Sequence, residues 1–224
     1  MTRPNPNDPA LRDRALLGPA RRWLSAGAFA LVLATLAGCA PLLIGGAVVG
    51  GALMATDRRS SGAQVDDEVI ELKARNRLNE AFADRASVKA ISYNRLVLLT
   101  GEVPQEADKT TAEQAVARVD NVQSVVNELT VGPPSTFSER TKDAFITTKV
   151  KASLVDAKDL FAQSIKVVTH RGTVYLMGRV TEREAIRAGE VARGVSGVAK
   201  VVRVFEVLTE AELANTQPRS VAKP

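Results

Sequence analysis

The chain has 224 residues, with 30 basic and 25 acidic side chains and a formal net charge of +5. It contains one cysteine and one histidine, which excludes a metal site built from those residues and a usable Ser-His or Cys-His catalytic pair. No glycine-rich phosphate-binding motif is present, and no pair of carboxylates stands out. We therefore expect a protein that is not an enzyme and that uses no metal ion or cofactor.

The first 38 residues have the pattern of a lipoprotein signal peptide. Five arginines precede a short apolar run, Leu24–Leu36, and residues 36–39 read Leu-Ala-Gly-Cys. A thiol in this place can carry diacylglycerol through a thioether before the peptide is cut. We predict that residues 1–38 are removed and that Cys39 is the lipidation site.

An uncleaved membrane span is the alternative interpretation of this region. The apolar stretch 23–55 is long enough for a transmembrane helix, but Pro41 and several glycines interrupt it. We favour the lipoprotein. Because residues 1–38 hold five arginines and two aspartates, the mature chain would carry a net charge of +2. This small charge removes the support for nucleic-acid binding by the protein as a whole.

The rest of the chain contains an internal repeat, in which residues 66–131 and 142–207 are two copies of one unit. Each copy has a helical pattern, two alternating strands around a tight turn, a second helix and a last strand. The fold class is therefore α+β, with two α-β-β-α-β domains that each pack a small three-stranded mixed sheet on two helices. The expected domains are a tether 39–65, a first domain 66–131, a Pro-containing linker 132–137, a second domain 138–208 and a disordered tail 209–224.

The expected elements can be given by residue range. In the first copy they are a helix that buries Ile70, Ala74 and Leu78, strands Val88–Tyr93 and Leu96–Val103, helix Gln105–Val119 and strand Val122–Val131. In the second copy they are a helix that buries Ile146, Val150 and Leu154, strands Ile165–His170 and Thr173–Val180, helix Glu182–Arg193 and strand Val198–Leu208. Thr181 and Glu184 form a predicted capping box. Gly172 suits a hairpin position with positive φ, whereas Arg95 does not.

The V-x-L-x-G-x-V strands, the Ala-rich helices and the valine-rich last strands resemble the BON domain. Two such domains behind a lipobox resemble the DolP/YraP family of dual-BON outer-membrane lipoproteins, most specifically at residues 55–60, 146–150 and 176–185. The resemblance implies a protein on the periplasmic face of the outer membrane that binds anionic phospholipid, such as phosphatidylglycerol, and supports envelope integrity. By the sorting rule of bacterial lipoproteins, Ala40 after the cysteine also implies the outer membrane. In this family the first helix of the second domain contacts lipid.

The residues favour the same helix independently. Phe145 lies beside the core stripe, and Lys142 and Lys149 share its face, with Lys151 further around the helix. An aromatic ring between ammonium groups suits the boundary between lipid headgroups and acyl chains. We therefore predict lipid-binding residues Phe145, Lys142, Lys149 and Lys151.

The first copy has Val69 in place of Phe145 and Asp66 in place of Lys142, so we expect anionic lipid to repel its helix. Two alternatives remain. Phe145 could pack into the core or against the other domain, with the lysines merely solvated. The protein could also be an adaptor that docks an envelope protein and contacts lipid only incidentally. We expect Phe137, Phe161 and Tyr175 to be packing residues and His170 to be a solvated turn residue.

Overall fold

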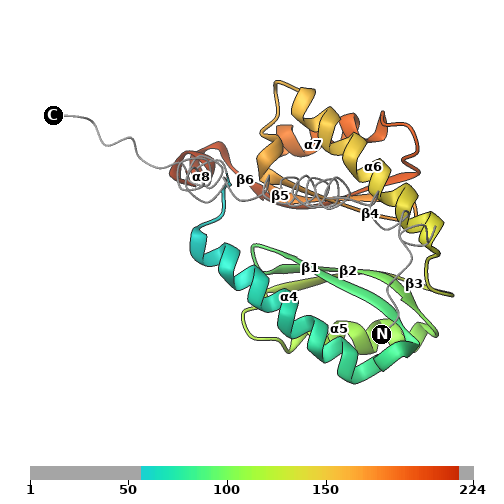
Figure 1. Cartoon of the computed structure of the whole chain (residues 1–224). Helices are drawn as coiled ribbons and strands as arrows, with labels where there is room; N and C mark the ends of the chain where they lie inside the picture. Colours follow the sequence, from blue (N-terminus) through green and yellow to red (C-terminus); the bar gives the residue numbers. More distant parts are fainter. Residues whose placement is uncertain (1–56, 217–224) are drawn as a thin grey trace, which may run out of the picture. The chain divides into compact units, whose positions relative to one another are not determined.

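The computed structural model describes residues 57–216. The predicted signal peptide, Cys39, most of the tether and residues 217–224 lie outside this range. The described part folds as two α-β-β-α-β domains, which confirms the predicted fold class (Figure 1). Within residues 57–216, no helix combines the length and the apolarity needed to cross a bilayer.

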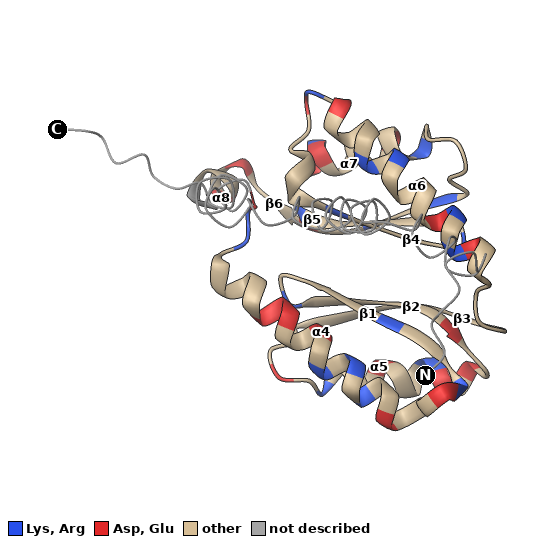
Figure 2. Cartoon of the chain, in the orientation of Figure 1, with Lys and Arg blue, Asp and Glu red and all other residues tan. Residues whose placement is uncertain are grey.

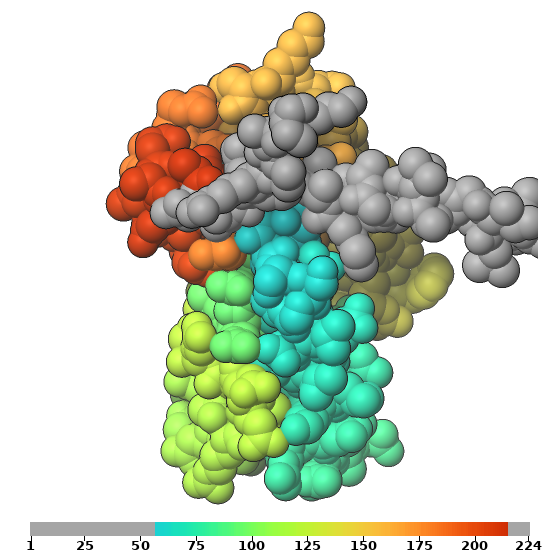
Figure 3. Space-filling view, turned by 90° about the vertical axis from the view of Figure 1, so that its left-hand side faces the viewer, coloured from blue at the N-terminus to red at the C-terminus, as the bar shows by residue number. Residues whose placement is uncertain are grey.

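The first domain contains α4 (Ser61–Phe82), β1 (Ser87–Tyr93), β2 (Leu96–Val103), α5 (Glu106–Ala117) and β3 (Ser124–Val131). A short 3-10 turn, Ala83–Arg85, joins α4 to β1. β2 lies in the middle of the sheet, antiparallel to β1 and parallel to β3. The helices α4 and α5 lie side by side, as Figure 3 also shows.

The second domain repeats this order with α6 (Phe137–Asp156), β4 (Ile165–His170), β5 (Thr173–Thr181), α7 (Glu182–Arg193) and β6 (Lys200–Leu208). A 3-10 turn, Ala162–Ser164, precedes β4. β5 is the central strand, antiparallel to β4 and parallel to β6. The predicted capping box forms at the start of α7, where the Thr181 hydroxyl and the Glu184 backbone N–H are hydrogen-bonded.

Each domain has its own hydrophobic core between the sheet and the helices. The apolar faces of the helices follow the predicted spacing, with Ile70, Ala74 and Leu78 buried in one core and Ile146, Val150 and Leu154 in the other. The glycine of each V-x-L-x-G-x-V strand is explained by a close approach of backbone. A Cβ at Gly101 would lie 1.9 Å from the Ser87 carbonyl oxygen, and one at Gly178 would lie 2.3 Å from that of Ser164.

A buried aspartate closes the hairpin of each domain, and the sequence reasoning missed both. Asp67 accepts hydrogen bonds from the backbone N–H groups of Asn94 and Arg95 at 2.7 and 2.8 Å. Asp143 accepts the equivalent bonds from Arg171 and Gly172 at 2.8 and 2.9 Å. The two turns are Asn94-Arg95 and Arg171-Gly172, and the backbone φ is positive at all four of these residues.

A third apolar cluster joins residues of the two sheets. It contains Tyr93 and Leu98 from the first domain and Tyr175, Met177 and Val204 from the second. The Tyr93 hydroxyl donates to the Ser164 carbonyl at 3.2 Å. Burial raises the pKa of both tyrosines to about 12. Tyr175 is therefore a packing residue, as predicted.

The segment before α4 binds the second domain. The Arg58 guanidinium forms two hydrogen bonds with the Glu184 carboxylate, at 2.7 and 2.8 Å, and Arg179 donates to the Arg58 carbonyl. Arg59 pairs with Asp67 on the first domain at 2.7 Å. The predicted tether 39–65 is therefore wrong in its last part, because Arg58 and Arg59 contact the domains and α4 already begins at Ser61, capped by the Ser60 hydroxyl.

Two further predictions need correction. The tail was expected to be disordered from Thr209 onward, but Glu210–Thr216 form a helix, α8. Thr209 and Glu212 cap it reciprocally, since the Thr209 hydroxyl accepts from the Glu212 backbone N–H and the Glu212 carboxylate accepts from the Thr209 backbone N–H. His170 is not solvated: its side chain is 13% exposed, and its Nε2 lies 3.1 Å from the Glu102 carboxylate.

Candidate functional site

The helix α6 is held in place by a strong N-terminal cap. Thr136 and Glu139 form a capping box, in which the Thr136 backbone N–H donates to the Glu139 carboxylate at 2.7 Å. The hydrogen bonds from Thr136 lower the pKa of Glu139, so this carboxylate stays ionised near the positive end of the helix dipole. The cap fixes where α6 begins and therefore which residues face the core.

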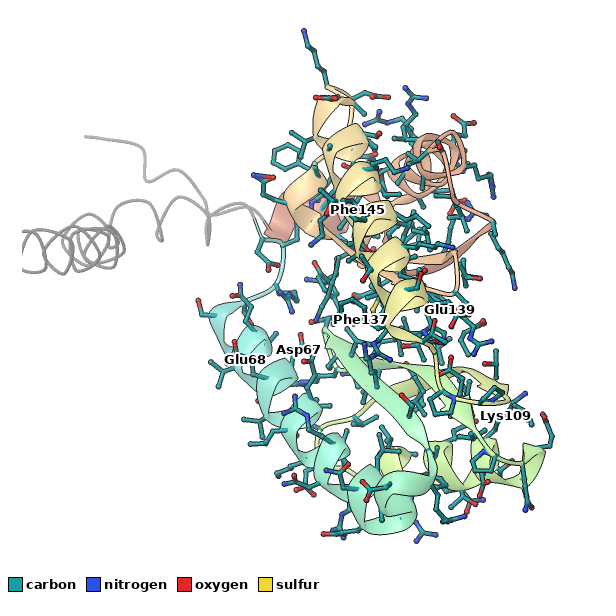
Figure 4. The ribbon with its side chains drawn as sticks, turned by 45° about the vertical axis from the view of Figure 1, so that its right-hand side comes forward. Asp67, Glu68, Lys109, Phe137, Glu139 and Phe145 are labelled. Carbon is teal, nitrogen blue, oxygen red and sulfur yellow. The ribbon has the colours of Figure 1, made fainter. Side chains whose placement is uncertain are left out.

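The outer face of α6 carries an exposed apolar stripe. Phe137, Phe145 and Val155 are 78%, 68% and 66% exposed. At about 100° per residue, these positions lie within roughly 80° of one another and on the side of the helix opposite the buried residues. Phe137 and Phe145 can be followed along this helix in Figure 4. We call Phe137, Phe145 and Val155 the α6 stripe.

This exposure resolves the question of where Phe145 lies. Its ring is not packed into the core of the second domain, so the core-packing alternative is wrong. The expectation that Phe137 is a packing residue is also wrong, since it is 78% exposed. Phe161 is 55% exposed, and its ring packs only in part, with the Arg58 guanidinium 5.5 Å from its centroid. A phenylalanine costs free energy when it is left in water, which makes several exposed rings on one face a mark of an interaction surface.

Basic side chains flank the α6 stripe on both sides. Lys142 and Lys149 lie on one flank, and Arg140 and Lys151 lie on the other. Lys142 and Lys151 are exposed and form no ion pair with any described residue. Lys149 differs, because its ammonium donates to the Ser196 carbonyl at 2.6 Å, in the loop after α7. The structure thus places Lys142 and Lys151 on opposite flanks of the α6 stripe, without an ion pair to the described part of the chain, and gives Lys149 a structural contact.

The corresponding face of α4 in the first domain is also apolar, with Val65, Val69 and Leu72 partly exposed. Acidic residues lie near its start, as Figure 2 shows. These residues should repel anionic lipid less than the sequence suggests, because Asp66 pairs with Arg95 at 2.6 Å and its charge is partly neutralised. Glu68 remains exposed and without an ion pair among the described residues. The two helices therefore present related faces, with smaller side chains on α4 and with Asp66 on α4 where α6 has Lys142, which is unpaired within residues 57–216.

The buried carboxylates of the described residues are committed to structure. Burial raises the pKa of Asp67, but hydrogen bonds from Ser92, from the backbone of Arg95 and Asn94, and from Arg59 outweigh it and lower the pKa. Burial likewise raises the pKa of Glu184, but its hydrogen bonds, first of all the one from Arg58, outweigh burial and lower the pKa. Such groups are ionised at neutral pH and already have their partners, so they are not candidates for proton transfer.

A polar cluster of Glu102, Ser135, His170 and Arg171 joins the two domains. Glu102 accepts hydrogen bonds from the Ser135 hydroxyl and from Arg171, and these outweigh burial and lower its pKa. His170 lies against the same carboxylate rather than against Ser135, so no Ser-His pair forms. The described residues contain no group of three or more side chains suited to holding a metal ion.

Comparison with known proteins identifies the two repeated domains. The model of the BON domain family matches residues 66–133 and 142–209. The chain belongs to the BON-domain family. It is 41% identical over 175 residues to a protein of Haemophilus influenzae named outer membrane lipoprotein DolP, an alignment that covers 77% of this chain and 90% of the relative. It is therefore a dual-BON protein of the DolP/YraP family.

Two other relatives are more distant. A 21 kDa hemolysin of Actinobacillus pleuropneumoniae is 35% identical over 66% of this chain and 78% of its own length. The osmotically-inducible protein Y of Escherichia coli is 28% identical over 62% of this chain and 72% of its own length. None of the three names denotes an enzyme.

Of the three residues of the α6 stripe, sequence reasoning found Phe145 and missed Phe137 and Val155. Lysines three residues before and four residues after it distinguish Phe145, whereas no pair of basic residues at these two spacings marks Phe137 or Val155. The signal was present in the spacing, since residues 137, 141, 145, 148, 152 and 155 share one face and include no charged residue. That spacing indicates a second uncharged stripe on α6, opposite the buried stripe of Ile146, Val150 and Leu154.

Proposed function

We propose that the protein is a lipoprotein of the outer membrane, on its periplasmic face, that binds anionic phospholipid such as phosphatidylglycerol through α6 and supports envelope integrity. The name of its H. influenzae relative supports the location in the envelope. The observation that carries the lipid-binding proposal is the α6 stripe, with large rings exposed between free lysines. Cys39, which lies outside the described residues, would supply the permanent anchor.

The α6 stripe suits a membrane surface in both chemistry and strength. Burying a large apolar side chain contributes about 1.5–3 kcal/mol, and a lysine near an anionic surface adds roughly 1 kcal/mol. Phe137, Phe145, Lys142 and Lys151 together would contribute on the order of 6 kcal/mol. This affinity is modest for a free protein, but an acyl anchor at Cys39 raises the effective concentration of the membrane at the helix.

Flotation of a fragment of residues 52–224, which contains every described element, tests this function without the acyl chains. We expect it to float with vesicles that contain phosphatidylglycerol and not with neutral vesicles. Phe145→Glu removes the ring and adds a repelled charge, and it should lower binding at least 50-fold with unfolding unchanged. Val69→Glu, at the equivalent position of α4, is the matched control and should bind normally. Unchanged flotation of Phe145→Glu would refute the site.

The adaptor remains a second candidate function because α4 also exposes Val65, Val69 and Leu72. In this case the first domain would dock an envelope protein, and lipid contact would be incidental. A photoreactive group at Leu72 in intact cells would then form one discrete protein adduct that Val69→Glu abolishes. A group at Phe145 that labels lipid, with no adduct from Leu72, would decide for the membrane function.

A further inference from the structure

A groove runs beneath the C-terminal half of α6, between this helix and the edge strand β4. It has a volume of about 300 Å³ and is lined by Leu154, Val155, Ile165 and Val167, with Lys151 at its rim. A second hollow of about 210 Å³ continues it toward Phe161 and shares Val155, Ala162 and Gln163 with it. We call this continuous feature the β4 groove.

The floor and the mouth of the β4 groove differ in exposure. Leu154, Ile165 and Val167 are buried members of the second core, whereas Val155 and Phe161 are exposed to solvent at the mouth. The groove is therefore preformed, since its floor is held by the core, and it presents an apolar opening. Val155 belongs both to this mouth and to the α6 stripe, so the opening is continuous with the surface proposed to meet the membrane.

The first domain contains the same groove with different chemistry. There it is lined by Arg75, Asn79, Val88, Lys89, Ala90 and Ile91, between α4 and β1. Asn79 stands where the second domain has Val155, and Ala90 stands where it has Val167. The fold thus makes a groove in both domains, with a basic residue, Arg75 or Lys151, at the same place. At these two differing positions, only the second domain lines the groove with large apolar side chains, Val155 and Val167.

We propose that the β4 groove takes one acyl chain of an anionic amphiphile, with the negatively charged headgroup at Lys151. This inference rests on the proposed lipid-binding function and specifies how the lipid would be held. Ligand pockets measure about 300–1,000 Å³, so the groove is at the small end of this range and suits a single chain rather than a two-chain lipid. Lys151 forms no ion pair with any described residue, which leaves its ammonium available to a phosphate.

A soluble one-chain lipid separates groove binding from attachment to a membrane. The probe is lysophosphatidylglycerol with a 14-carbon chain, titrated below its critical micelle concentration into the 52–224 fragment by calorimetry. We expect saturable binding of one molecule per protein. Glycerophosphoglycerol, which has the headgroup without a chain, should not bind. Lysophosphatidylcholine should bind at least fivefold more weakly, because Lys151 would face a zwitterionic headgroup.

Three variants locate the probe. Ala162→Trp fills the groove from its turn and should weaken binding at least tenfold. Val155→Asn, which installs the residue of the first domain, should weaken it severalfold. Phe145→Glu lies outside the groove and should bind the monomeric lipid within twofold of the wild type while losing vesicle binding. Thermal unfolding of each variant checks that it is folded, and Ala90→Phe in the first domain's groove is the control and should bind normally.

The outcomes distinguish this inference from the proposed function. Wild-type protein that floats with anionic vesicles but shows no saturable binding of the probe would overturn the groove and leave the membrane function standing. Normal binding by both folded groove variants would also overturn it. Vesicles whose phosphatidylglycerol carries a photoreactive acyl chain should label β4, which would assign the occupant to bilayer lipid. Probe binding by the fragment but not by the lipidated mature protein would instead assign the groove to the protein's own acyl chain and overturn the proposal.

Discussion

At the scale of single residues, Asp67 and Asp143 explain how the two hairpins tolerate their sequences. Asn94, Arg95 and Arg171 have φ values of 50°, 66° and 47°, a region that residues other than glycine rarely adopt. In each domain one carboxylate accepts the two backbone N–H groups of the turn. Bonds of this kind to a charged acceptor are stronger than neutral ones, and they offset the unfavourable backbone conformation.

Removing this carboxylate gives a sharp prediction for stability. Asp143→Ala leaves the backbone N–H groups of Arg171 and Gly172 without their acceptor, and we expect it to lower the free energy of unfolding by about 3 kcal/mol. Chemical denaturation measures the change. Asp156→Ala, at the exposed end of the same helix, is the control and should change it by less than about 0.5 kcal/mol. A loss below 1 kcal/mol at Asp143 would contradict the role given to it.

The residues of α6 differ in how far the sequence alone predicts their surroundings. The lysines around Phe145 predicted that its ring is exposed, and the structure agrees. Phe137 was misassigned because apolar character alone does not say which face of a helix a residue occupies. Lys149 was grouped with the lipid-binding lysines because its contact with Ser196 joins residues far apart in the chain, which helical spacing cannot reveal.

At the scale of elements, periodicity predicted nearly every helix and strand of both domains. Strands Leu96–Val103 and Ile165–His170 and helix Glu182–Arg193 have their predicted ends. The misses lie where a capping residue extends structure beyond the apolar pattern. Helix α4 starts early because Ser60 caps it, and α8 follows from the Thr209–Glu212 capping box, a local signal that the sequence contained.

The lysines on the two flanks of α6 should contribute unequally to vesicle binding. Lys142→Ala and Lys151→Ala each remove a free cation worth roughly 1 kcal/mol at an anionic surface, so the double variant should bind vesicles about 10- to 30-fold more weakly. Its binding should also depend less on salt. Lys149→Ala should stay within twofold of the wild type, because its ammonium contacts Ser196. Equal losses for all three lysines in flotation assays would contradict this division.

At the scale of the whole molecule, the two domains are joined by both apolar and charged contacts. The shared cluster around Leu98 and Met177 is ringed by pairs such as Lys166 with Glu71 at 2.9 Å and Arg171 with Glu102 at 2.7 Å. Arg58 adds a contact to Glu184, a residue 126 positions away. No local pattern encodes such pairs, which is why the sequence yielded the domains and their repeat but neither the interface nor the Arg58 contact.

The two tyrosines of the chain, Tyr93 and Tyr175, report directly on this interface. Burial raises the pKa of each to about 12, so neither should ionise near pH 10.5 in the folded protein, as absorbance at 295 nm would show. An unfolded tyrosine ionises near pH 10, so stability should fall as the pH rises above about 10. Met177→Asp places a charge in the apolar cluster and should open the interface, and the exposure of both rings to water should then return the tyrosine pKa values toward 10. Wild-type titration near pH 10 would contradict a closed interface.

Lipid binding through α6 requires the ring at position 145 to enter an anionic bilayer. Trp23 is the only tryptophan and lies outside the 52–224 fragment, so Phe145→Trp gives that fragment a single fluorescent probe. With phosphatidylglycerol vesicles we predict a shift of its emission to shorter wavelength and quenching by brominated acyl chains. Val69→Trp on α4 should show neither. Emission from the Phe145→Trp indole that is unchanged and unquenched under saturating anionic lipid would show that α6 does not insert into the bilayer.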